Sequence, residues 1–342
     1  MDEIRQTARE RMRGYCRVCP VCDGRACAGE VPGMGGIGTG SAFTENLRAL
    51  AARHLKMRLI HDVAEPEISV TLFGQNLGMP VLAAPIGGVS FNMGGRISEA
   101  DYIQAVLSGC KSMGTLGGTG DGAPDFIHET AFAAIRDVGG AGIPFIKPWA
   151  EAELFEKLDA AVATGAPAVG MDVDAAGLIT LRLMGRPVSP KGPDALRKII
   201  ERVPRPMIIK GVMTPADARL AADAGAAGIV VSNHGGRVLD GTPGVAAVLP
   251  EVAKAVRGRL TVLADGGVRS GGDVLKLLAL GADAVLIGRP ISVAAVGGLK
   301  EGVVQYLEKI RSELITAMIL TGSPNLAAID GSILHGTGEA TP

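Results

Sequence analysis

Short apolar runs alternate along most of the chain with longer segments in which apolar residues recur at helical spacing. Eight runs of four or five residues follow one another: 80–84, 112–116, 143–146, 168–171, 206–209, 228–231, 260–263 and 284–287. Runs that are apolar throughout are typical of parallel strands, which are buried on both faces. The segments between them, such as 151–164, 215–224, 244–256 and 271–280, are predicted to be helices.

Eight strand and helix units in roughly 230 residues match an α/β fold of the closed (β/α)8 barrel type, whose usual length is about 250 residues. A doubly wound open sheet is the structural alternative. Polar residues favour the barrel, because Lys210, His234, Asp265 and Arg289 each come just past the end of a predicted strand. A barrel gathers such residues around one mouth, whereas an open sheet spreads them along an edge.

The residues before the repeating pattern form a separate N-terminal extension with its own chemistry. A polar helix is predicted over 1–11, a second helix over 41–54 with Ser41 or Thr44 as its N-cap, and a glycine-rich passage over 33–40 that cannot be regular helix. We therefore expect two parts: an extension of residues 1–62 that contains a cysteine cluster and a helix, and a barrel of residues 63–342.

Composition narrows the class of protein. Apolar residues make up 47% of the chain and charged residues 20%, which is a globular balance. The net charge of −1, with no basic stripe, argues against nucleic-acid binding. The first residues lack an apolar signal core, and no uncharged apolar run reaches roughly 18 to 20 residues, so we expect a cytoplasmic protein without membrane insertion.

Four of the five cysteines lie close together, as Cys16-x2-Cys19-x2-Cys22-x4-Cys27. In a reducing compartment such a cluster indicates metal or redox use more than a disulfide framework. The spacing is more typical of iron–sulfur ligation than of structural zinc, whose two cysteine pairs are usually a dozen or more residues apart. Zinc and a redox disulfide pair stay open as alternatives.

Glycine and arginine follow the last two predicted strands. Asp265, Gly266, Gly267 and Arg269 precede the helix predicted over 271–280, and Gly288 and Arg289 follow the final strand. Glycines let a backbone approach a phosphate, helix N-termini present free N–H groups, and arginines add positive charge. We favour a phosphate site over the alternative, two ordinary tight loops with capping residues.

A histidine with acid–base potential occurs in Ser232-Asn-His-Gly-Gly-Arg237. An imidazole can take a proton near neutral pH, and an arginine can hold a carboxylate with two hydrogen bonds. His234 and Arg237 therefore predict a site for a small acid that bears a proton to be removed. Lys210, at the end of its strand, either reaches to solvent or faces an anionic ligand.

Taken together, these motifs resemble the FMN-dependent 2-hydroxy-acid oxidases and dehydrogenases, the family of glycolate and lactate oxidases. The resemblance covers Ile-Ile-Lys-Gly-Val, Ser-Asn-His-Gly-Gly-Arg-Val-Leu-Asp, Ala-Asp-Gly-Gly-Val-Arg-Ser-Gly-Gly-Asp-Val and Ile-Gly-Arg-Pro, within residues 206–290. A weaker likeness extends forward through 170–174 and 79–85 to 57–63.

The resemblance implies a role for each matching residue. His234 would be the general base, Arg237 would bind the substrate carboxylate, and Lys210 would stabilise reduced FMN. The remaining cofactor contacts would come from Pro85, Ile86, Gly87, Ser232, Asp265, Gly266, Gly267, Arg269, Gly288 and Arg289.

The chain also departs from the family pattern near the substrate. Two tyrosines expected there are absent from 32–36 and 145–149, a Ser-Ser pair is replaced by Gly117-Gly118, and an expected arginine is missing after Asp174. Lys147, Trp149 and Asp172 are candidates to line a differently shaped pocket, or are strand-end residues without a ligand.

The sequence thus predicts oxidation of a small, lactate- or glycolate-like 2-hydroxy acid to the 2-oxo acid, with hydride transfer to FMN. An FMN barrel with another reaction, such as an isomerase or a different reductase, and a metal-binding barrel without enzymatic activity stay open. We expect a homo-oligomer whose partners are a small 2-hydroxy acid and an electron acceptor that the sequence does not identify. Cys16, Cys19, Cys22 and Cys27 are the candidate ligands of an iron–sulfur cluster or zinc.

Overall fold

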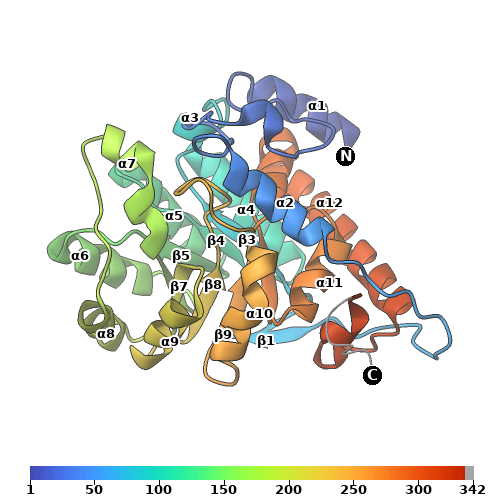
Figure 1. Cartoon of the computed structure of the whole chain (residues 1–342). Coiled ribbons are helices and arrows are strands. Elements are labelled where there is room, and N and C mark those ends of the chain that lie inside the picture. The colour runs from blue at the N-terminus through green and yellow to red at the C-terminus, as the bar shows by residue number, and fades with distance from the viewer. Residues whose placement is uncertain (336–342) are drawn as a thin grey trace.

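A closed barrel of eight parallel strands forms the centre of the computed structural model, which describes residues 1–335 (Figure 1). In barrel order the strands are β3 (Val81–Ile86), β4 (Gly117–Thr119), β5 (Gly142–Ile146), β6 (Val169–Asp172), β7 (Met207–Val212), β8 (Gly228–Val231), β9 (Thr261–Ala264) and β10 (Ala284–Ile287), which pairs with β3. The barrel prediction is confirmed; residues 336–342 of the predicted barrel part lie outside the described residues.

Successive residues of a strand point to opposite faces of the barrel wall, and each face packs into its own core. In β3, Leu82 belongs to an inner hydrophobic cluster, whereas Val81 and Ala83 belong to the outer cluster beneath the helices. A hairpin of β1 (Val70–Leu72) and β2 (Gln75–Leu77), which the sequence did not predict, adds Leu72 and Leu77 to the inner cluster. Both faces of the barrel strands are thus buried, which explains why the predicted strand segments consist almost wholly of apolar residues.

Helices surround the strands (Figure 1). The larger ones are α4 (Glu99–Ser112), α5 (Asp125–Asp137), α6 (Glu151–Val162), α8 (Pro193–Arg202), α9 (Pro215–Asp223), α10 (Val245–Ala255), α11 (Gly271–Ala279) and α12 (Arg289–Thr321), and two short ones are α3 (Val89–Asn92) and α7 (Ile179–Leu183). Four short 3-10 turns cover Arg25–Cys27, Val173–Gly177, Leu326–Ala328 and Gly331–Ile333. The four helices predicted between the strand segments are confirmed to within two residues at each end, as is the helix predicted over 1–11. The helix predicted over 41–54 ends three residues earlier, at Ala51. Within the described part of the chain, every helix is too short or too polar to span a membrane.

The second strand was predicted in the wrong place. Ser112 is the last residue of α4, Gly114 ends that helix with φ of 67°, and β4 begins only at Gly117. The apolar residues around Met113 belong to the helix end, where burial without periodicity imitates a strand. Gly118 is required in β4, because a Cβ there would lie 2.9 Å from the backbone nitrogen of Pro85 in β3.

The N-terminal extension packs on the barrel rather than apart from it. Helix α1 (Asp2–Arg11) lies along α12 (Figure 1). Ile4 reaches so close to Gly297, Gly298 and Gly302 that a Cβ on Gly297 would be 2.0 Å from the Ile4 carbonyl oxygen. Helix α1 therefore packs closely against the glycine surface of α12.

Helix α2 (Ser41–Ala51) packs against α10 and against the loop that follows β8. Its N-cap is Gly40, with no side-chain cap, so the predicted cap at Ser41 or Thr44 is wrong. The Ser41 hydroxyl instead donates to Asp240 at 2.6 Å. The predicted boundary between residues 62 and 63 stays a prediction, although contacts of this kind join the two parts.

Candidate functional site

One cavity opens at the carboxyl ends of the barrel strands and holds nearly every residue singled out in the sequence. It contains about 1230 Å³ of space that protein atoms do not fill, part of it open to solvent. Its lining includes Pro85, Ile86, Gly87, Lys210, His234, Arg237, Asp265, Gly266, Gly267, Arg269, Gly288 and Arg289. The closed barrel thus brings together residues that are up to 204 positions apart (85 to 289).

Ser232 lies beneath the cavity wall instead of lining it. Its fully buried hydroxyl donates to a carboxylate oxygen of Asp265 at 2.8 Å and accepts the backbone N–H of His234 at 3.0 Å. Both contacts fix neighbours that do line the cavity. Its predicted cofactor contact stays a prediction, while its positioning role follows from these bonds.

A bulge in β7 aims Lys210 into the cavity. The pairing of β7 with β8 shifts between Lys210 and Val212, and the residue between them, Gly211, has φ of 103°. A Cβ on Gly211 would lie 2.6 Å from Asp174, so glycine is required here. Lys210 therefore lies inside the strand, and the prediction that it follows the strand end is wrong.

Acidic side chains hold the Lys210 ammonium in place. Its Nζ lies 3.0 Å from Asp172 Oδ1, and both side chains are buried. Burial alone would lower the pKa of Lys210, but the carboxylates of Asp172, Asp174 and Asp265 together raise it. Burial raises the pKa of Asp265, opposed mainly by the Lys210 charge. Lys210 is consequently a fixed positive charge at neutral pH.

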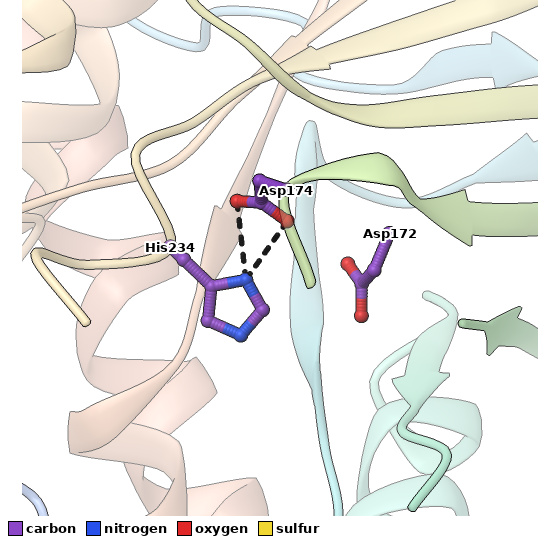
Figure 2. Close-up of side chains that lie close together, drawn as sticks. All are labelled: Asp172, Asp174 and His234. Atoms are coloured by element: carbon purple, nitrogen blue, oxygen red, sulfur yellow. Dashed lines mark hydrogen bonds and ion pairs between the residues drawn. The ribbon is translucent and has the colours of Figure 1, made fainter. Parts of the chain in front are cut away.

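His234 pairs with an acidic residue from the neighbouring part of the barrel (Figure 2). Its Nδ1 lies 3.0 Å and 3.1 Å from the two carboxylate oxygens of Asp174. Burial would raise the pKa of Asp174, but the charges of His234 and Lys210 outweigh it and lower the pKa to about 2. Asp174 is therefore ionised, and it orients the ring.

The same contacts assign the imidazole tautomer. Lys210 Nζ is 3.3 Å from His234 Nδ1, farther than either Asp174 oxygen, and it already forms an ion pair with Asp172 at 3.0 Å. We therefore place the proton on Nδ1, facing Asp174, which leaves Nε2 as the proton acceptor.

Asp172, Asp174 and His234 are also the only group of three metal-binding side chains gathered within 4.8 Å in residues 1–335. Lys210 argues against a metal ion between them. Its ammonium already supplies the positive charge, at 3.0 Å from Asp172 and 3.3 Å from His234. A second cation at the same place would be repelled at close range.

The backbone at His234 is turned sharply. His234 has φ of 55°, and Gly235 and Gly236 follow with φ of 63° and 79°. Left-handed conformations are unfavourable for a residue with a Cβ, and they persist where surrounding structure enforces them. Here the Ser232 hydroxyl, Asp174 and the glycines that follow enforce this turn, which presents the imidazole at the mouth.

Three arginines, Arg237, Arg269 and Arg289, line the same cavity without a carboxylate partner among the described residues. Arg237 donates to the Gly33 carbonyl, and Arg289 donates to the carbonyls of Met34 at 2.7 Å and Gly235 at 3.0 Å. Burial lowers the pKa of Arg237 to about 10. Burial and the charges of Arg237 and Arg269 lower the pKa of Arg289 to about 9. Such a concentration of uncompensated positive charge favours binding of an anion.

Two details of the predicted phosphate site differ from expectation. The start of α11 is already capped: Ser270 and Asp273 form a capping box, and Glu313 accepts the N–H of Gly271 at 2.9 Å. Free N–H groups were therefore wrongly predicted there. A Cβ on Gly267 would lie 2.8 Å from the backbone oxygen of Asn46, so this glycine accommodates α2.

The candidate residues of the differently shaped pocket divide into two groups. Lys147 and Asp172 line the cavity and lie 3.9 Å apart. Trp149 does not line it: its indole N–H donates to buried Asp121 at 2.6 Å, and Lys157 Nζ lies 4.4 Å from the ring centre. Trp149 is part of the supporting wall.

Sequence reasoning missed two polar residues of this site. Asp174 and Asn92 were given no role, yet Asp174 binds His234 and Asn92 accepts a hydrogen bond from Arg237 at 2.9 Å. The doublet Asp172-Val-Asp174 at a strand end was a usable signal, because two carboxylates there are placed at the mouth. Asn92 lies in a short helix with no such signal.

The four N-terminal cysteines lie next to the arginines, outside the cavity lining. All four are free thiols and partly buried. Arg269 Nη2 lies 3.3 Å from the Cys22 carbonyl oxygen and 3.4 Å from its sulfur. The structure thus brings the cysteine segment against the predicted phosphate end of the site.

Comparison with known proteins gives strong matches. A segment of 134 residues is 58% identical to an L-lactate dehydrogenase of Caulobacter sp. (strain K31), covering 39% of this chain and 35% of that protein. That match therefore spans only about a third of the relative's length. Over 324 residues the chain is 32% identical to 4-hydroxymandelate oxidase of Amycolatopsis orientalis, covering 86% of this chain and 90% of the relative.

Solved structures agree with the sequence matches. The crystal structure of a mandelate oxidase variant with 2-hydroxy-phenylacetamide superposes with a TM-score of 0.79 at 29% identity, and the match covers 96% of both chains. The FMN-dependent dehydrogenase family matches residues 33–182 and 182–336, which together are most of the sequence. The chain therefore belongs to the FMN-dependent dehydrogenase family.

Proposed function

We propose that this protein binds FMN and oxidises a 2-hydroxy acid to the corresponding 2-oxo acid. One observation carries the proposal: a histidine oriented by an ionised carboxylate shares a cavity with a fixed lysine charge and a group of arginines. The histidine–carboxylate pair and the lysine suit removal of the substrate's hydroxyl proton, and the arginines suit the anionic groups of substrate and cofactor.

The residues present fit FMN. Arg269 and Arg289 supply positive charge for a phosphate, and Arg269 Nε is buried without a hydrogen-bond partner in the described part of the chain. One carboxylate oxygen of Asp265 is likewise buried and unpartnered, as expected for an acceptor that a polyhydroxyl chain would satisfy. Pro85 and Gly87 line the same cavity as these residues and Lys210, and they are candidates to contact the flavin ring.

The protein's own residues would act on the substrate in a defined arrangement. When bound, FMN accepts the two electrons and the hydrogen that leave the substrate. His234 Nε2 takes a proton from the substrate, and Asp174 stabilises the imidazolium that results. Arg237 holds the substrate carboxylate, giving up contacts with the backbone of residues 33–35. Lys210 keeps a positive charge where negative charge develops, held by Asp172.

Several residues that line the cavity are apolar, and they indicate the kind of side chain that the substrate carries. The residues concerned come from α3, α5 and the segment around α7: Phe91, Ile127, Leu178, Leu181 and Met184. An apolar wall favours an apolar group, and each buried methylene adds about 0.8 kcal/mol. We propose a substrate with an apolar side chain, within a range from lactate to mandelate.

An anaerobic spectrum tests the proposal directly. The purified protein is expected to show bound flavin, and its absorbance should bleach on addition of lactate, mandelate or a branched aliphatic 2-hydroxy acid. Glycolate, which has no side chain, is expected to be the poorest of the series. Protein that takes up no FMN, or bound flavin that none of these acids reduces, would refute the proposal.

The homo-oligomeric state and the cytoplasmic location stay predictions from the sequence. Met57, Leu59 and Ile60 support assembly, because their side chains are highly exposed on the segment before the barrel. Light scattering measures the mass of the particle, and a mass equal to one chain would contradict assembly.

A further inference from the structure

The cysteine segment is the one motif that the oxidation chemistry leaves without a role. It lies on the extension that covers the barrel mouth, in contact with Arg269. We propose that Cys16, Cys19, Cys22 and Cys27 are the four thiolate ligands of a metal centre, and that this centre is an iron–sulfur cluster.

The four cysteines lie on one closed loop of the N-terminal extension. The Met34 N–H donates to the Tyr15 carbonyl at 3.1 Å, and Arg17 donates two hydrogen bonds of 2.6 Å to Glu30, so the two ends of the segment that carries Cys16–Cys27 are held side by side. All four thiols are free and partly buried in this loop. Four thiols gathered on one closed loop have an arrangement from which a shared metal centre can be built.

Two N–H donors already point at sulfur. The backbone N–H of Val18 donates to Cys16 Sγ at 3.4 Å, and the Arg269 guanidinium donates to Cys22 Sγ at the same distance. Hydrogen bonds to sulfur stabilise thiolate ligands and tune iron–sulfur centres. Val18 adopts φ of 45°, a conformation that is rare for a β-branched residue and typical of functional segments.

Arginine charge lies beside the cysteine segment. The Arg269 guanidinium is 3.4 Å from Cys22 Sγ. A positive charge at this distance balances part of the negative charge of a metal centre with four thiolate ligands. Arg269 would then face the cofactor phosphate on one side and Cys22 on the other.

The four sulfurs do not meet at one point, as the ligands of a single metal ion would. No three of these sulfurs lie within 4.8 Å of one another in the described residues. Gly14 and Gly29, with φ of 90° and 76°, flank the segment and provide backbone freedom for closure. The compact spacing, with no more than four residues between successive cysteines, is the feature that favours iron–sulfur over zinc.

Metal analysis of anaerobically purified protein tests the proposal. Iron and acid-labile sulfide in equal amounts, together with a broad visible absorbance beyond that of flavin, are the expected result. Protein that holds zinc and no iron would overturn the proposal. So would protein that binds no iron after reconstitution with ferrous iron and sulfide. FMN is measured separately after acid release, so failure of the oxidation chemistry cannot be mistaken for absence of the cluster.

Variants locate the ligands. Cys22→Ser and Cys19→Ser should each lose nearly all iron, whereas Cys110→Ala should keep it, because Cys110 is fully buried in α4. Circular dichroism and FMN content show whether each variant folds. If folded Cys22→Ser and Cys19→Ser proteins both retain iron at the level of Cys110→Ala, the cluster is not held by these cysteines.

Discussion

Asp174 and His234 stand 60 residues apart in the chain, yet both carboxylate oxygens of Asp174 lie within 3.1 Å of His234 Nδ1. Three features bring about this contact. The barrel places the end of β6 near the end of β8, the bulge at Gly211 leaves room for Asp174, and the left-handed turn at His234 directs the ring toward it. The arrangement fixes which ring nitrogen is free to accept a proton.

Removal of the negative charge from Asp174 should slow catalysis without displacing the cofactor. Asp174→Asn preserves the shape of the side chain, but it no longer stabilises the imidazolium. General bases contribute roughly 10²- to 10⁴-fold, so we expect flavin reduction by substrate to slow at least tenfold, and His234→Ala to slow it by about that full range. Stopped-flow reduction under anaerobic conditions measures both, and an unchanged rate in His234→Ala would exclude it as the base.

Loss of one buried arginine should weaken cofactor binding. Arg289→Gln removes one charge from the arginine group, and hydrogen bonds to charged groups contribute about 1.5–3 kcal/mol. We expect the dissociation constant of FMN to rise about 10- to 100-fold. Arg259→Gln is the control, because Arg259 pairs with Asp223 at the surface, at 2.6 Å. Equal FMN affinity in the two variants would argue against a phosphate at Arg289.

Glycine at position 236 should be needed for docking of α2. A Cβ there would lie 2.4 Å from the backbone nitrogen of Phe43, whereas Gly241 has a similar φ of 76° and no atom within 4 Å of a Cβ. Gly241→Ala therefore incurs only the backbone strain, about 1–2 kcal/mol. Gly236→Ala should lower the free energy of unfolding by about 1–3 kcal/mol more than Gly241→Ala does. Thermal unfolding of the two variants gives the difference, and equal stabilities would contradict the packing.

Asp240 should stabilise the extension only while it is ionised. The Ser41 hydroxyl and the hydroxyl and N–H of Thr39 donate to it and lower its pKa well below the ordinary value. A carboxylate with a lowered pKa stabilises the fold above its unfolded pKa of about 3.9, and this stabilisation is lost as pH falls. The stability difference between wild type and Asp240→Asn should thus be constant near neutrality and shrink below about pH 4. A difference that grows on acidification would contradict this assignment.

Trp149 should matter for stability more than for substrate binding. Trp149→Phe removes the indole N–H that donates to Asp121, leaving that buried oxygen with the Lys147 N–H at 3.0 Å. The variant should therefore lose about 1–3 kcal/mol in free energy of unfolding. KM should change less than twofold, because Trp149 does not line the cavity. A large rise in KM with normal stability would instead show that Trp149 contributes to substrate binding.

The barrel could be predicted because its signal is repeated. Seven of the eight predicted strands overlap the observed ones, since each is a fully apolar run between helical segments. The exception, 112–116, failed because β4 itself is only Gly117–Thr119, too short and too rich in glycine to show a strand pattern. The hairpin of β1 and β2 was missed because its strands have three residues each.

The candidate site could be predicted at its most distinctive motifs and not at its supporting contacts. His234, Arg237 and the glycine-arginine segments are recognisable by local sequence, and the structure places them in one cavity. The doublet Asp172-Val-Asp174 could have marked Asp174 as a residue of the mouth, but its pairing with His234 depends on how the strands pack, which no local pattern encodes. Trp149 shows the opposite error. It follows a strand and was therefore a candidate for the pocket, yet its side chain packs against Asp121 and does not line the cavity.

The contact of Ile4 with Gly297, Gly298 and Gly302 has a consequence for biosynthesis. The ribosome releases α1 first, but the groove that receives it exists only after α12 has been made. The segment that carries Cys16–Cys27 follows α1 directly, so α1 cannot anchor it on the barrel before α12 has been made.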